Sequence, residues 1–104
     1  MSLGRILKGS TGPAWTVQCL KADNSVLVIT GATITGVMYD RLGTGTAITL
    51  DNSYSITDGP AGKFTYTPDA TDVSLYGFYD IYWTVAVGGI NYVFADDIEI
   101  GKIP

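Results

Sequence analysis

Histidine is absent from this 104-residue chain, and cysteine occurs only once. Without histidine the chain has neither a Ser-His nor a Cys-His pair, and it lacks the commonest general base and a frequent zinc ligand. The single cysteine, Cys19, excludes an internal disulfide, which weakly favours folding in a reducing compartment. Because Cys19 is in phase with Trp15 and Val17, we expect a small buried residue and not a reactive thiol.

Positive charge is scarce in the second half of the chain. Residues 1–63 carry five basic and four acidic groups, whereas residues 64–104 carry one basic and six acidic groups, so the net charge of −4 is concentrated there. An acidic half repels phosphate, and we expect no nucleic-acid partner. The apolar runs are far shorter than the ~20 residues of a membrane span, so we expect no membrane partner. No basic-then-apolar signal peptide opens the chain, so export by that route is not indicated.

Helical periodicity is missing too, and a period of two replaces it. The longest alternation has an apolar face made of Tyr79, Ile81, Trp83, Val85 and Val87. Gly88-Gly89 suits a two-residue hairpin turn, which needs positive φ at both positions. Residues 90–94 continue the alternation on a returning strand. Together with the alternating segment 63–67, these residues predict three consecutive antiparallel strands.

Further short alternating segments, with turn residues between them, cover most of the remaining chain. They are residues 15–21, 32–39, 46–50 and 54–57, with a last short piece at 98–100 after Asp96-Asp97. Gly36 stands between the inward-facing Ile34 and Met38, which indicates a bulge or a close backbone approach. Turn signals every 8–12 residues are typical of a sandwich or small barrel of about seven to eight strands. We predict one all-β domain over residues 15–104, preceded by an N-terminal arm at residues 1–14 that contacts neighbouring molecules.

Several segments resemble the small immunoglobulin-like domains of bacteriophage tail and baseplate proteins, with the N-terminal domain of phage baseplate upper proteins as the nearest group. Ile29-Thr30-Gly31-Ala32-Thr33-Ile34 is similar to their entry into a strand. The glycine turn and aromatic strand at residues 59–66 are similar as well. The further matching positions, in chain order, are Asp72, Gly77, Tyr79, Trp83 and Gly88-Gly89. The resemblance covers residues 15–100.

This resemblance implies an immunoglobulin-like antiparallel β-sandwich that acts as a non-catalytic virion component. Its expected partners are other virion proteins and copies of itself, and its expected location is the virion, after synthesis in the bacterial host cytoplasm. Gly77-Phe78-Tyr79 also resembles the tyrosine corner of such folds, in which Tyr79 is structural. Tyr76 and Tyr82 are the best candidates for an exposed interaction surface, because they fall on the face opposite the core.

Other functions remain as alternatives. The leading one is a carbohydrate-binding or adhesion module that uses exposed aromatic side chains, drawn from Tyr39, Tyr54, Tyr76, Phe78, Tyr82 and Tyr92. A calcium site is conceivable among Asp69, Asp72, Asp96, Asp97 and Glu99, but these residues lack the regular spacing of a calcium loop, and solvated surface charge explains them better. A paired-carboxylate glycosidase needs only two acids, so that pattern has little specificity. We therefore predict no catalytic residues, no metal site and no cofactor.

Overall fold

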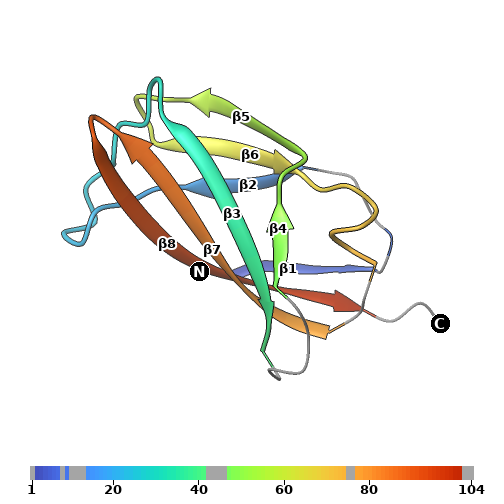
Figure 1. The fold of residues 1–104 in the computed structure, drawn as a ribbon. Helices are drawn as coiled ribbons and strands as arrows, with labels where there is room; N and C mark the ends of the chain where they lie inside the picture. The colour runs from blue at the N-terminus through green and yellow to red at the C-terminus, as the bar shows by residue number, and fades with distance from the viewer. Residues whose placement is uncertain (1, 8, 10–13, 42–46, 75–76, 102–104) are drawn as a thin grey trace.

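The computed structural model describes residues 2–7, 9, 14–41, 47–74 and 77–101, and it folds into two facing β-sheets (Figure 1). One sheet has the strand order β1 (Ser2–Leu7), β8 (Ile90–Gly101), β7 (Gly77–Val87), β3 (Thr33–Asp40) and β4 (Ile48–Leu50). The other has the order β2 (Trp15–Gln18), β6 (Lys63–Thr67) and β5 (Ser53–Asp58). The described chain contains no helix, and so none that could span a membrane. The predicted all-β sandwich is confirmed at this level.

The centre of the larger sheet is the hairpin of β7 and β8. Its pairs run without interruption from Val87 opposite Ile90 to Gly77 opposite Ile100. The turn residues Gly88 and Gly89 have φ angles of 62° and 78°, as the two-residue turn requires. The alternation that predicted this hairpin is therefore confirmed, and it fixes which side chains of both strands face the core.

Gly36 lets β3 pack directly against the aromatic core. It lies opposite Trp83 in the pairing of β3 with β7. A Cβ atom at position 36 would lie only 2.6 Å from Cε3 of Trp83 and 2.9 Å from the hydroxyl oxygen of Tyr54. The predicted close approach is confirmed, and Ile34 and Met38 on either side are buried.

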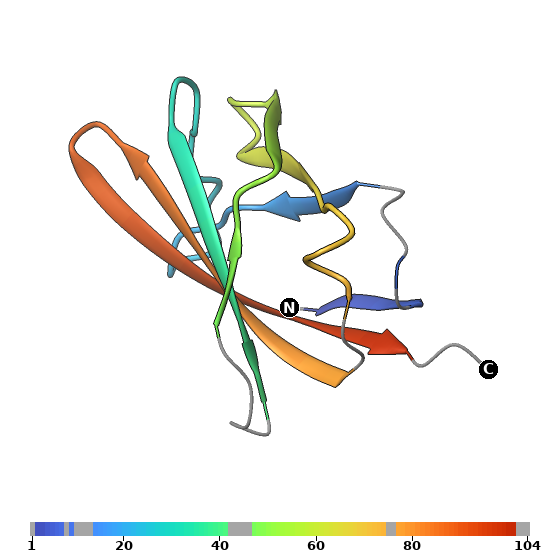
Figure 2. The same cartoon turned by 45° about the vertical axis from the view of Figure 1, so that its right-hand side comes forward.

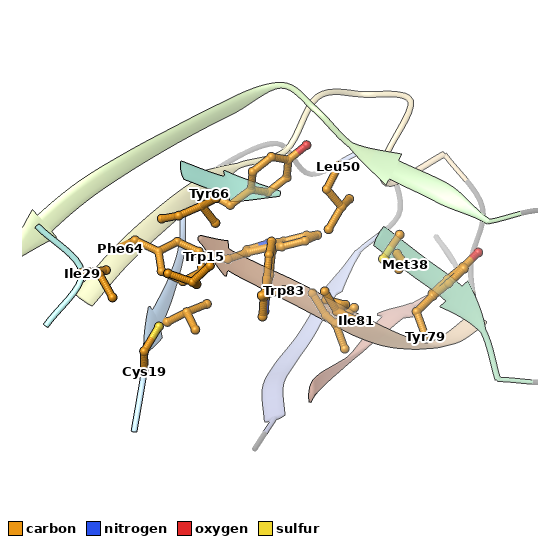
Figure 3. Close-up of a cluster of buried hydrophobic side chains, with 14 of the residues drawn as sticks. Trp15, Cys19, Ile29, Met38, Leu50, Phe64, Tyr66, Tyr79, Ile81 and Trp83 are labelled. Atoms are coloured by element: carbon orange, nitrogen blue, oxygen red, sulfur yellow. The ribbon is translucent and has the colours of Figure 1, made fainter. Parts of the chain in front are cut away.

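The core between the sheets contains a group of aromatic rings with Trp83 at its centre (Figure 3). The Trp83 ring centroid lies 5.5 Å from that of Phe64 and 5.8 Å from that of Tyr66. Both partner rings belong to β6 and are fully buried. Cys19 is also fully buried, as its position in the alternation predicted. Rings from opposite layers therefore pack against one another and help to join the two sheets.

Three features of the fold differ from the pattern read in the sequence. β6 belongs to the smaller sheet, so the chain crosses between the layers before β7 and the three predicted strands do not form one sheet (Figure 2). β8 runs without a break through Asp96 and Asp97, where a separate last strand was expected. The strand predicted at residues 15–21 is shorter, because β2 ends at Gln18 and an isolated bridge between Leu20 and Val26 follows it.

The N-terminal segment that was expected to form an arm contains a strand of the larger sheet. Backbone residues Ser2–Leu7 form β1, which pairs in parallel with β8 from Asp97 to Gly101. Figure 1 and Figure 2 both show β1 lying along the end of β8. Because β1 takes only part of β8, the rest of that strand edge has no neighbouring strand among the described residues. Whether the arm contacts other molecules stays a prediction.

Candidate interaction surface

The outer face of the larger sheet carries a group of exposed aromatic and charged side chains. We call Tyr39, Arg41, Phe78, Asp80 and Tyr82 the outer-face cluster. Tyr39 and Tyr82 project from β3 and β7, with exposed fractions of 45% and 41%. Their ring centroids lie 5.8 Å apart, with an angle of 66° between the ring planes. The strand alternation explains their position, because the adjacent residues Met38 on β3 and Ile81 and Trp83 on β7 face the core.

Arg41 ties the charged part of the cluster together. Its guanidinium Nη2 lies 2.9 Å from Oδ1 of Asp80 and 3.5 Å from Oδ2 of Asp97. Asp80 and Asp97 are directly opposite each other on β7 and β8, where two like charges repel. The hydrogen bond that Arg41 donates to Asp80, together with the negative charge of Asp80, raises the pKa of Arg41 above its ordinary value. The cation therefore offsets a repulsion that the pairing of the strands creates.

The predicted surface residues have different outcomes. Tyr82 lies on the outer face and is exposed, as the alternation indicated. Tyr76 lies outside the described residues. Tyr54 packs in the core, with its ring centroid 4.7 Å from that of Tyr66. Sequence reasoning missed the partnership of Tyr82 with Tyr39, because a contact between side chains of two strands depends on how the strands are paired.

The acidic residues do not gather into a metal centre in the part of the chain that the structure describes. Asp96 is buried on the inner face of β8, whereas Asp97, the next residue, reaches Arg41 on the outer face. Asp69 and Asp72 bond to each other's backbone, with the Asp72 amide 2.9 Å from Oδ1 of Asp69. The view of these acids as solvated surface charge is wrong for Asp72 and Asp96, which are only 2% and 4% exposed.

Both buried carboxyl groups have hydrogen-bond donors in the aromatic core. The indole Nε1 of Trp83 donates to Oδ2 of Asp96 over 3.2 Å, and the hydroxyl of Tyr66 donates to Oδ2 of Asp72. Burial raises the pKa of both carboxyls, and these hydrogen bonds oppose that rise. Oδ1 of Asp96 is buried and has no hydrogen-bond partner among the described residues. Through these hydrogen bonds Asp72 helps to position the ring of Tyr66, and Asp96 helps to position the ring of Trp83.

A pocket of about 500 Å³ lies between the segment after β2 and the first half of β8. Its lining is mostly apolar and consists of Leu20, Lys21, Ala22, Tyr92, Val93 and Phe94. Val93 is the most exposed large hydrophobic residue described, with 64% of its surface accessible. Among the described residues that line this pocket, Lys21 alone carries a charge, so its chemistry favours apolar side chains over a charged ligand.

Two comparisons with known proteins were informative only in that neither identifies a relative of this chain. A scan against protein-family models finds no match, and a search of curated proteins also finds none. The fold and the surfaces described above therefore carry the functional argument.

Proposed function

We propose that this chain is an immunoglobulin-like structural domain of a bacteriophage or prophage particle, in the tail or baseplate, that acts through protein–protein contacts. The observation that carries the proposal is the outer-face cluster. Tyrosine, phenylalanine and arginine are enriched at protein interfaces, and exposed aromatic side chains gathered on one face mark such contacts. The resemblance of residues 15–100 to phage tail and baseplate domains supplies the kind of assembly.

The two-sheet architecture supports this function because it presents a broad, pleated face on a rigid frame. Tyr39 and Tyr82 are held by strands in the interior of the sheet, with neighbours on both sides. Little side-chain entropy is lost when an aromatic residue with only two rotatable bonds is covered. In a symmetric particle one such contact repeats many times, so a weak single interface becomes strong collectively.

The test is an immunoblot on density-purified particles from the source culture. We expect this chain to sediment with intact particles at a fixed ratio to another particle protein. Particles assembled with Tyr82→Ala should contain much less of it, whereas Ser55→Ala, at an exposed position of β5 in the other sheet, should be incorporated normally. A chain found wholly in the soluble or cell-surface fraction would overturn the proposal.

A carbohydrate-binding or adhesion module is the second candidate, because the exposed Tyr39 and Tyr82 rings could stack on a sugar. The angle of 66° between the rings weakens this alternative, since the two rings do not form one flat platform. A glycan screen separates the two functions. Saturable binding that is lost in Tyr82→Ala would favour the carbohydrate module over the assembly domain.

A further inference from the structure

The first half of β8 is an open strand edge. Val87 and Ile90 flank the two-residue hairpin turn and form a hydrogen-bonded pair. From there along the hairpin, hydrogen-bonded and non-hydrogen-bonded pairs alternate. The even-numbered residues of β8 therefore bond to β7, and the odd-numbered residues direct their amide and carbonyl groups to the other side. β1 pairs with this outward side only from Asp97 onward. The outward groups of Asn91, Val93 and Ala95 have no hydrogen-bond partner in the described ranges.

The other sheet edges carry features that discourage pairing with a further strand. Natural edges are protected by short strands, by bulges and by charged side chains. β4 has three residues and β2 has four. The pairings of β1 and β5 each contain a register shift. Residues 90–95 of β8, in contrast, contain no charge, no proline and no bulge.

The pocket lies beside this same edge. Leu20, Lys21 and Ala22 form one wall, and Tyr92, Val93 and Phe94 of β8 form the other. A strand added to β8 would continue the sheet, and its inward side chains would enter the pocket. The edge therefore offers unpaired backbone groups and an apolar site for alternate side chains, the two elements of recognition by strand addition.

We propose that a second copy of this chain occupies this edge, with the two β8 strands antiparallel about a two-fold axis at Val93. In this arrangement Val93 lies opposite its own counterpart, and Asn91 lies opposite Ala95. All outward amide and carbonyl groups of these residues are then paired. On the inner face of the joined sheet, Tyr92 lies opposite Phe94 of the second copy, and aromatic pairs of this kind stabilise adjacent strands.

Self-complementarity is the reason for choosing a second copy over another protein. A two-fold interface brings the same segment together twice, so any charge near its centre would meet itself. Each copy has a net charge of −4, yet residues 90–95 are uncharged, and the acids of β8 begin at Asp96. In this dimer the Gly88-Gly89 turn of each copy would lie next to the start of β1 of the other copy, where two glycines need little space. The inference rests on the proposed assembly function and names one of its contacts.

The test is sedimentation equilibrium of the full chain over a range of concentrations. The wild type should dimerise. Val93→Lys and Val93→Asp should each dissociate the dimer about a hundredfold more readily, because like charges would oppose each other at the axis. An equimolar mixture of the two variants should restore a dimer, now held by opposite charges. Thr35→Lys, at an exposed position on the outer face of β3, is the matched control and should dimerise as the wild type does.

Several results would overturn the inference. They are a wild type that stays monomeric, a Val93→Lys variant that dimerises normally, and a mixture of charged variants that fails to pair. Because Val93 is highly exposed, both variants should fold, and circular dichroism checks this. A monomeric chain that still sediments with particles would refute the β8 dimer alone. A dimer that is absent from particles would refute the virion function alone.

Discussion

The tight contact at Gly36 makes a sharp test of the core. In an open strand, replacing glycine with alanine stabilises a protein by about 0.4–1 kcal/mol, because the unfolded chain loses freedom. At position 36 the new methyl group would lie 2.6 Å from Cε3 and 2.7 Å from Cζ3 of Trp83. Carbon atoms pack best at about 3.5–4.0 Å, so the ring or the strand must move by about 1 Å.

The Trp83 ring has little room to move. It is fully buried, its Nε1 donates to Asp96, and the rings of Phe64 and Tyr54 meet it edge-on at centroid distances of 5.5 and 6.2 Å. Overpacking of this kind typically costs about 1–3 kcal/mol. We expect Gly36→Ala to lower the free energy of unfolding by about 2 kcal/mol, which corresponds to a fall of about 8–16 °C in Tm.

Chemical and thermal denaturation, followed by tryptophan fluorescence and circular dichroism, measure this loss. The control is Thr35→Ala, the exposed neighbour on the same strand, which should change the free energy of unfolding by less than about 1 kcal/mol. In a Trp83→Leu background the added methyl group should cost much less, because the ring that it meets is gone. A Gly36→Ala variant as stable as the wild type would refute the account of this contact.

Three further predictions concern buried polar groups. Burial raises the folded-state pKa of Asp96 above 3.8, so above that pH the folded chain binds more protons than the unfolded chain. The free energy of unfolding should therefore fall as the pH rises through the folded-state pKa. Urea titrations at several pH values measure this fall, and Asp96→Asn should reduce it. Burial raises the pKa of Cys19 to about 11, so a thiol reagent should label it only as fast as the chain unfolds; rapid labelling of the native chain would contradict its burial. Tyr66→Phe removes a hydrogen-bond donor to the buried Asp72 and should cost about 1–3 kcal/mol in urea unfolding, whereas a neutral result would mean that the bond contributes nothing.

The local pattern of the sequence predicted those parts of the fold that depend on neighbouring residues. The alternation in β7, the glycine turn after it and the close approach at Gly36 are all confirmed. Each follows from a period of two or from the conformational needs of a turn, which a few adjacent residues determine. The exposure of Tyr82 on the outer face followed from the same alternation.

The pairing of distant segments was decided only by the tertiary structure. Three features depend on which strands become neighbours: the placement of β6 in the smaller sheet, the parallel pairing of β1 with β8, and the contact between Tyr39 and Tyr82. Asp96 shows the same limit. A separate last strand was expected after Asp96-Asp97, yet β8 continues through both residues, and the Trp83 indole gives the inward carboxyl of Asp96 a hydrogen-bond donor. Period and turn chemistry act over a few residues, whereas sheet order and the partners of buried polar groups are set by the packing of the whole chain.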